Sequence, residues 1–149
     1  MRRIYLATFI PHQTVSAIWE GFDEHLLERL NPPWVSAELI RFDGNQPGDE
    51  VHLRLNLIVM KQHWVSQITD NQRSAEQIAF VDEGKQLPFF LKQWQHRHLI
   101  RAVQGGAEIV DDIRFSTGTL LTDALLYPAL YVQFWYRQPI YRKAFTPAT

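Results

Sequence analysis

Two histidines separated by one residue are the first feature of the chain that could do chemistry. His96 and His98 lie in the stretch "WQHRHLI", which alternates like a strand and places both imidazoles and Trp94 on one face, with Arg97 on the other. Four kinds of site fit this pattern: a buried hydrogen-bonded network, the polar end of a ligand cavity, a general acid–base pair and a metal site. Histidine suits acid–base work because its charge changes near neutral pH.

Two aspartates are expected to join the histidines. The strand "AEQIAFVDEG" places Asp82 on the same face as Phe80, and the strand "AEIVDDIRFST" places Asp111 with Ile113 and Phe115. If these faces all line the interior, acids and imidazoles meet in mostly apolar surroundings. A nearby carboxylate favours the imidazolium form, whereas burial opposes it. The pattern fits both a structural network and the polar part of a ligand site.

A catalytic role would use His96 or His98 as the acid or base, oriented by Asp111, as a cyclase, dehydratase or hydrolase needs. The chain contains no cysteine and no G-x-S-x-G motif, so nothing marks a nucleophile and no catalytic residue is assigned. His-x-His on a strand places two imidazoles on one side, and a carboxylate would complete a set of two histidines and one carboxylate. Because no third histidine follows at a recognised spacing, we predict no metal and no cofactor.

Antiparallel strands, two short helices and one long helix are expected to position these residues. The expected strands cover residues 3–10, 34–42, 50–60, 64–70, 75–84, 89–101 and 107–117, the short helices 15–23 and 24–30, and the last helix about 119–145. The double proline at 32–33 ends the second helix, and Pro128 and Pro139 are expected to bend or interrupt the last one. The order has no βαβ alternation and no Gly-rich phosphate loop, which excludes a doubly wound nucleotide-binding fold.

Composition restricts the class of protein and of partner. At 149 residues the chain is one domain's worth, so we expect a single domain over 1–149. A formal net charge of -1 argues against a nucleic-acid partner. The absence of cysteine excludes disulfides and fits a reducing compartment. The N-terminal stretch "MRRIYLATFIPHQT" lacks a small-residue cleavage site, so we expect no signal peptide and a cytoplasmic protein.

One apolar segment, residues 119–136, approaches the length of a membrane span. It contains Asp123, Pro128 and Gln133, however, and a spanning helix needs about 20 consecutive apolar residues. A helix packed on a sheet is therefore the better interpretation, with no stable membrane insertion.

Several segments together resemble one superfamily. In order along the chain they are "IWEGFDEHLLERLNPPW", "WVSQIT", "FVDEG", "LPFFLKQWQHRHLI", "IVDDIRF" and "FWYRQPIYRKAF". They resemble the START, birch-pollen-allergen and polyketide-cyclase superfamily, often called SRPBCC, and in particular a group of small stand-alone bacterial members of unassigned function. The likeness covers nearly the whole chain. It has two departures, since Gly84 stands where a glutamine is common and Pro139 interrupts the last helix just after Arg137.

The resemblance implies an α+β helix-grip fold, in which a curved antiparallel sheet of about six to seven strands wraps around a long C-terminal helix, with two short helices after the first strand. Superfamily members use the cavity between sheet and helix for lipids, sterols, polyketides and other hydrophobic molecules. We therefore expect a hydrophobic or amphipathic ligand of the lipid, isoprenoid or polyketide class. The residues expected to contact it are Asp82, Trp94, His96, His98, Asp111, Phe115, Tyr131, Phe134, Trp135 and Arg137.

Two other functions stay open on the sequence. The first is a polyketide cyclase or dehydratase-like enzyme that uses His96 or His98, and the second is an interaction module with a filled interior. Cavity volume distinguishes an interaction module with a filled interior from a ligand-binding protein, because a continuous pocket of roughly 300 Å³ or more supports binding.

Overall fold

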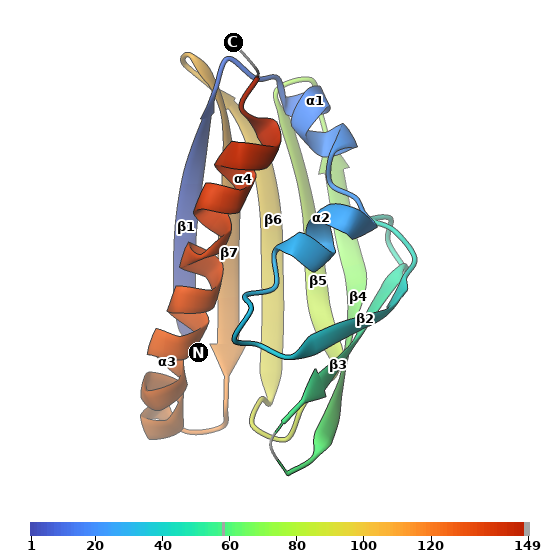
Figure 1. Ribbon diagram of the computed structural model, residues 1–149, viewed down its shortest axis with the longest axis vertical. Helices are drawn as coiled ribbons and strands as arrows, with labels where there is room; N and C mark the ends of the chain where they lie inside the picture. The colour runs from blue at the N-terminus through green and yellow to red at the C-terminus, as the bar shows by residue number, and fades with distance from the viewer. Residues whose placement is uncertain (58, 148–149) are drawn as a thin grey trace.

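The computed structural model describes residues 1–57 and 59–147 and contains one seven-stranded antiparallel sheet (Figure 1). Its strands, in the spatial order β1-β7-β6-β5-β4-β3-β2, are β1 (Arg2–Pro11), β7 (Gly106–Ser116), β6 (Gln93–Val103), β5 (Gln77–Gln86), β4 (Lys61–Arg73), β3 (Glu50–Asn56) and β2 (Ala37–Phe42). The helices are α1 (Val15–Glu20), α2 (Glu24–Arg29), α3 (Leu120–Trp135) and α4 (Arg137–Phe145). Apart from the break between α3 and α4, this order confirms the expected helix-grip fold.

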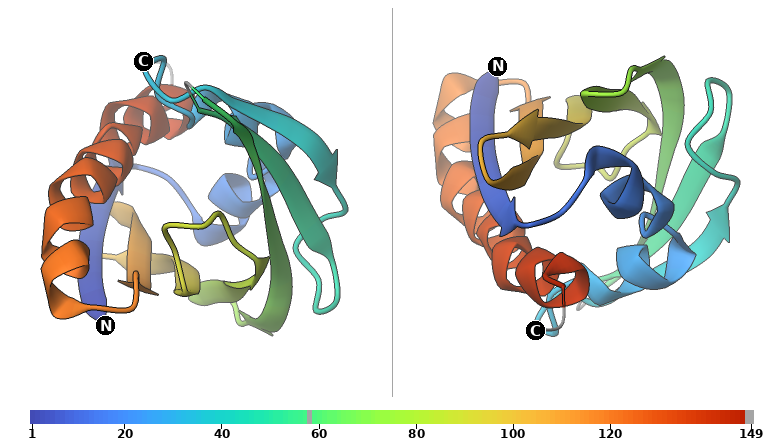
Figure 2. Two further views of the ribbon diagram at one scale, coloured as in Figure 1. Left: turned by 90° about the horizontal axis from the view of Figure 1, so that it is seen from below. Right: turned by 90° about the horizontal axis from the view of Figure 1, so that it is seen from above.

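The sheet curves strongly, and α3 and α4 run along its open side. Seen along the strands, these helices lie next to β1 at one end of the sheet, while β2 and β3 form the opposite wall (Figure 2). The two sides meet where the ring of Trp34, just before β2, packs edge-on against Tyr136 between the two helices, with ring centroids 4.9 Å apart. The helices therefore cover the inner face of the sheet. The expected site residues of the strands lie on this inner face.

Alternation of apolar and polar residues explains which strand faces are buried. In β1, Ile4, Leu6, Thr8 and Ile10 are buried and their neighbours are exposed or half-buried. Apolar residues of the inner strand faces belong to two clusters, one beneath α1, α2 and α4 and one beneath α3. Period-two burial of this kind is what an antiparallel sheet with one covered face requires.

Side-chain caps fix where the helices begin. Thr14 accepts a hydrogen bond from the backbone N–H of Ala17 at the start of α1, and Asp23 accepts one from Leu26 at the start of α2. Thr119 caps α3 in the same way. Such caps satisfy N–H groups that have no partner inside the helix, so they set the direction in which each helix leaves the sheet.

The two prolines of the last helical segment behave differently. Pro128 lies inside α3, which runs on past it to Trp135, so the expectation of an interruption there is wrong. Pro139 stands at the third position of α4, directly after the break at Tyr136. A proline ring crowds the carbonyl four residues earlier, here that of Trp135, and its nitrogen donates no hydrogen bond. Pro139 therefore fits the first turn of a new helix but not the middle of an old one.

Several strand boundaries differ from the sequence-based ones. The strand expected over 34–42 begins at Ala37, and the strand expected over 50–60 ends at Asn56. Ile58 lies outside the described residues, and Val59 is 86% exposed. β4 already begins at Lys61, where a turn was expected. β6 begins at Gln93, because the Phe89–Phe90 segment after Pro88 forms a turn.

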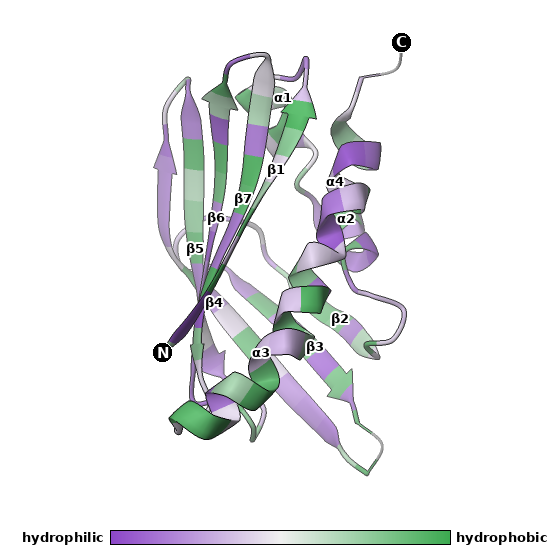
Figure 3. Cartoon of the chain, turned by 90° about the vertical axis from the view of Figure 1, so that its left-hand side faces the viewer, coloured by the Kyte–Doolittle hydropathy of each residue, from purple (hydrophilic) through white to green (hydrophobic). Residues whose placement is uncertain are grey.

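The outer side of α3 is apolar. Figure 3 shows hydrophobic residues along much of this helix, and Leu120, Leu121 and Leu125 are 75%, 71% and 70% exposed. Within residues 1–57 and 59–147, no helix has the length and apolar character that crossing a membrane requires.

Candidate functional site: a histidine–aspartate cluster at the end of a pocket

The register of the central strands brings the four expected side chains together. Asp82 on β5 lies directly opposite His96 on β6, and His98 lies directly opposite Asp111 on β7. All four project from the inner face, as the alternation of their strands predicted. Three adjacent strands therefore supply one compact cluster, with no loop involved in positioning it.

Two short hydrogen bonds pair the histidines with the aspartates diagonally. His96 Nε2 lies 2.8 Å from Asp111 Oδ1, and His98 Nε2 lies 2.9 Å from Asp82 Oδ2. His96 Nδ1 is also 3.7 Å from Asp82 Oδ2, so His96 stands between both carboxylates. His96 and Asp111 are only 3% and 2% exposed. A network this deeply buried has to satisfy most of its own polar atoms.

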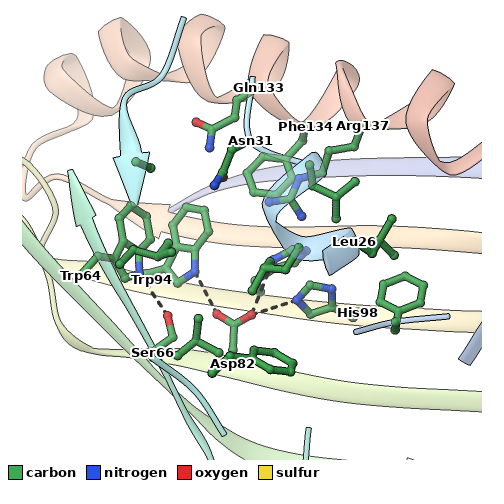
Figure 4. Close-up of a pocket in the computed structure, with 18 of the residues that line it drawn as sticks. Leu26, Asn31, Trp64, Ser66, Asp82, Trp94, His98, Gln133, Phe134 and Arg137 are labelled. Atoms are coloured by element: carbon green, nitrogen blue, oxygen red, sulfur yellow. Dashed lines mark hydrogen bonds and ion pairs between the residues drawn. The ribbon is translucent and has the colours of Figure 1, made fainter. Parts of the chain in front are cut away.

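Neighbouring groups hold the carboxylates in place. Trp94 Nε1 donates to Asp82 Oδ1 at 3.2 Å, and the Tyr141 hydroxyl donates to Asp111 Oδ1 at 3.4 Å. Arg137, the first residue of α4, brings its Nη1 to 3.8 Å from the same oxygen of Asp111. The ends of the cluster are thus fixed by the last helix on one side and by β6 on the other (Figure 4).

Aromatic rings pack against both imidazoles. His98 is sandwiched between Phe80, at 4.3 Å between ring centroids, and His96, at 3.6 Å. Phe134 meets His96 edge-on at 5.1 Å, and the Arg137 guanidinium carbon lies 4.3 Å from the Phe134 ring centroid. These contacts restrict ring rotation, so the nitrogen positions are set by packing as well as by hydrogen bonds.

The two aspartates are held ionised. Burial opposes the charge of Asp82, but its hydrogen bond with His98 and its interaction with His96 together lower its pKa below the ordinary value. Burial likewise opposes the charge of Asp111, and its hydrogen bond with His96 and its attraction to Arg137 still lower the pKa. The cluster therefore contains two negative charges in a low-dielectric interior, which have to be compensated nearby.

His98 and Tyr141 are both kept neutral by their surroundings. Burial, reinforced by repulsion from His96, lowers the pKa of His98 to about 4 despite the opposing pull of Asp82. Burial also raises the pKa of the Tyr141 hydroxyl, and the charge of Asp111 raises it further. At neutral pH His98 is therefore an uncharged imidazole at the wall of the pocket.

The cluster forms the polar end of a pocket enclosed by α2, α3, α4 and the strands β2 to β6. The residues that line it are Phe22, Asp23, Leu26, Leu27, Leu30, Asn31, Val35, Ala37, Phe42, Asn45, Val51, Leu53, Leu55, Trp64, Ser66, Ile68, Phe80, Asp82, Trp94, His96, His98, Leu130, Gln133, Phe134 and Arg137. Most of them are apolar; Asp82, His98 and Trp94 form a hydrogen-bonded group at one end, and Asn31 and Gln133 lie apart from it (Figure 4).

The enclosed part of the pocket is small. Space open to the centre of a water-sized molecule amounts to about 120 Å³, within about 1010 Å³ of atom-free space that includes the open mouth. The enclosed part alone stays below the roughly 300 Å³ at which drug-sized sites begin. An apolar cavity of about 150 Å³ nevertheless holds one benzene ring. The pocket therefore suits one ring or a chain segment inside, with the rest of a larger molecule in the mouth.

Six of the ten expected contact residues line this pocket: Asp82, Trp94, His96, His98, Phe134 and Arg137. The other four do not. Asp111 lies behind His96, and Phe115 is fully buried in the apolar cluster beneath α3. Tyr131 and Trp135, expected to wall the cavity, are 38% and 55% exposed, because α3 turns Leu130 and Phe134 toward the sheet instead.

Several pocket residues were not singled out from the sequence. Leu26 and Asn31 come from α2 and the turn after it, and Trp64 from β4. Gln133 stands one helical turn before Arg137, a spacing that places both on one face and could have indicated it. The N–H groups at Nε and Nη1 of Arg137 are buried without a hydrogen-bond partner among the described residues.

Comparison with known proteins places the fold. The sequence matches no protein-family model, and no curated protein matches it significantly. Among solved structures, the chain is similar to the Zhui aromatase/cyclase from Streptomyces sp. R1128, with a TM-score of 0.62 and 12% identity over 96% of this chain and 93% of that one. It is also similar to Ara h 8.0201, with a TM-score of 0.59 and 12% identity over 95% and 98%.

A third similar structure belongs to a longer chain. A nucleoside-diphosphate sugar epimerase from Corynebacterium glutamicum matches with a TM-score of 0.66 and 21% identity, over 94% of this chain but only 28% of that one. At such identities the likeness concerns the fold alone. The chain has a helix-grip fold, in which a curved antiparallel sheet encloses C-terminal helices.

Proposed function

We propose that this protein binds a hydrophobic or amphipathic small molecule in the pocket between its sheet and its C-terminal helices, as a single helix-grip domain. The observation that carries the proposal is the composition of the pocket: apolar walls from α2 and β3, and a polar end at Asp82 and His98. Ligand sites typically combine mostly apolar walls with a few placed polar groups. The interior is not completely filled, as that of an interaction module would be, although its open space of about 120 Å³ is smaller than the roughly 300 Å³ that would support binding by volume alone.

The geometry also favours a class of ligand. Leu26 and Leu53 belong to the apolar part of the lining, so a bound molecule would present a polar group to His98 and its apolar body to side chains such as these. The small enclosed volume favours a slender or single-ring molecule over a bulky polycyclic one. Lipid, isoprenoid and small polyketide compounds have this character, and one protein of similar structure is an aromatase/cyclase.

Binding can be followed by the protein's own fluorescence, because Trp64 and Trp94 line the pocket. A fatty acid, an isoprenoid alcohol and an aromatic polyketide, each titrated separately, should show saturable quenching for at least one class. The variant Leu53→Trp fills the pocket and should abolish this binding, whereas Ile40→Trp, on the exposed part of β2, should leave it intact. Equal quenching in both variants, or none with any class, would contradict the proposal.

A second candidate is an enzyme of the cyclase or dehydratase type. The bond between His98 and Asp82 favours it, because a neutral histidine oriented by a carboxylate at a pocket wall is the arrangement of a general base. His98→Gln keeps a nitrogen near the position of Nε2 but cannot accept a proton. An enzyme would lose turnover in this variant with near-normal binding, whereas a binding protein would change only in affinity or stability.

A further inference from the structure

Three potential ligand atoms converge at the polar end of the pocket. Asp82, His96 and His98 each offer one, and these three atoms all lie within 4.8 Å of one another. From this geometry we propose that the protein binds one divalent transition-metal ion, such as Zn²⁺, through Asp82, His96 and His98. The sequence placed Asp82 and the two histidines on inner strand faces but led us to predict no metal; the sheet register now sets Asp82 directly opposite His96.

The spacing of these atoms is close to that of a metal site. Asp82 Oδ2 lies 2.9 Å from His98 Nε2 and 3.7 Å from His96 Nδ1. Around a tetrahedral ion with bonds of about 2.0–2.2 Å, neighbouring ligand atoms lie roughly 3.3–3.6 Å apart. The two observed distances lie on either side of this range, so shifts of a few tenths of an ångström bring both into it. Two imidazoles and one carboxylate favour transition metals over Ca²⁺ or Mg²⁺, which prefer oxygen ligands.

The surrounding hydrogen bonds orient the ligands. Histidines that bind metals generally donate their other ring N–H to a carboxylate or carbonyl. His96 does so here, since its Nε2 bonds to Asp111 Oδ1, which leaves the Nδ1 lone pair free. Trp94 donates to Oδ1 of Asp82, so that Oδ2 is the oxygen that faces the two imidazoles. Arg137 lies 3.8 Å from Asp111 and helps to keep that acceptor charged.

Charge also favours a cation at this place. The carboxylates of Asp82 and Asp111 both lie in this buried cluster, and the guanidinium of Arg137 lies near Asp111. Buried carboxylates need positive charge nearby. A bound metal ion would supply such charge beside Asp82. Because Asp82, His96 and His98 all line the pocket, the remaining coordination positions face the space where a bound molecule would lie.

The test is a Zn²⁺ titration of the untagged protein by calorimetry, after chelator treatment and without any organic ligand. We expect one ion per chain. His98→Ala and Asp82→Ala should each weaken binding by at least about 100-fold, and Asp111→Asn by about 10–100-fold through loss of the negative charge that orients His96. The matched control is His52→Ala, which removes a surface histidine paired with Glu50 at 2.9 Å and should leave the affinity unchanged.

A measurement on the unaltered protein covers the case in which these variants do not fold. The chain has six histidines. Co²⁺ added to the wild type should perturb the imidazole signals of His96 and His98 in NMR spectra before those of the other four. Absence of stoichiometric binding, or Co²⁺ effects confined to other histidines, would overturn the proposal. Neither result would touch small-molecule binding, which the fluorescence titration measures independently.

Discussion

His96 Nε2 and Asp111 Oδ1 form a 2.8 Å hydrogen bond between two side chains that are almost fully inaccessible to solvent. The bond joins β6 to β7 on the inner face of the sheet, and Arg137 reaches the same carboxylate from α4. One side chain therefore connects two strands and the C-terminal helix, which gives Asp111 a larger structural role than its surface neighbours.

Removing the charge of Asp111 should strongly destabilise the protein. Asp111→Ala leaves the buried side chains of His96 and Arg137 without their acceptor, and breaking a buried pair in this way typically costs about 3–5 kcal/mol. The natural control is Asp112→Ala, because the next residue pairs with Arg3 on the outer face, where ion pairs contribute little. Urea unfolding of both variants checks this prediction, and equal losses of stability would contradict it.

Acid should destabilise the fold well above the pH at which carboxylates usually titrate. The pKa of His98 in the folded protein is about 4 instead of 6.5, so below pH 6.5 the unfolded chain binds a proton at His98 that the folded chain does not. This contribution to stability is complete above pH 6.5 and is lost as the pH falls to about 4, on the order of 3 kcal/mol. Because the pKa values of Asp82 and Asp111 are also lowered in the folded protein, stability continues to fall below pH 3.8.

Urea unfolding between pH 7.5 and about 4 would measure this slope, with EDTA present so that no metal competes with protons. His98→Gln has no titrating group at this position, so its stability should fall less between pH 6.5 and 4. A variant curve parallel to the wild-type curve over that interval would show that His98 is not the residue responsible.

Gly84 should tolerate no side chain while Leu87 is present. A Cβ added to Gly84 would lie 2.5 Å from Leu87 Cδ2, closer than real contacts allow, so Gly84→Ala forces Leu87 to move. Overpacking of this kind costs about 1–3 kcal/mol. Leu87→Ala should cost stability by itself but should remove most of the effect of Gly84→Ala. A double-mutant cycle measures this coupling, and purely additive effects would contradict it.

The inward-facing cluster was accessible from the sequence because strand side chains alternate strictly. Period two placed Asp82, His96, His98 and Asp111 on inner faces without any knowledge of the register. The pairing of each acid with one histidine was not accessible, since it depends on which residues stand opposite one another across the strands. Bulges such as the one between Val65 and Ser66 shift that register without a clear sequence signal.

The helical wall of the pocket was predicted less well for a different physical reason. Apolar residues surround α3 on nearly all sides, so periodicity does not reveal which side faces the sheet. Phe134 was correctly expected to face inward, whereas Tyr131 and Trp135 lie on the exposed side. The departure at Gly84 has a structural counterpart, because Leu87 fills the space that a larger residue would take.

Native mass spectrometry tests the central claim, that the pocket holds a small molecule, most directly. The wild type, Leu53→Trp and Ile40→Trp would each be incubated with a lipid and isoprenoid extract, and their complexes identified after denaturing release. We predict a 1:1 adduct of one chemical class with the wild type and with Ile40→Trp, and its loss in Leu53→Trp, whose new side chain fills the pocket. The same adducts in all three proteins, or no adduct in any of them, would contradict the account.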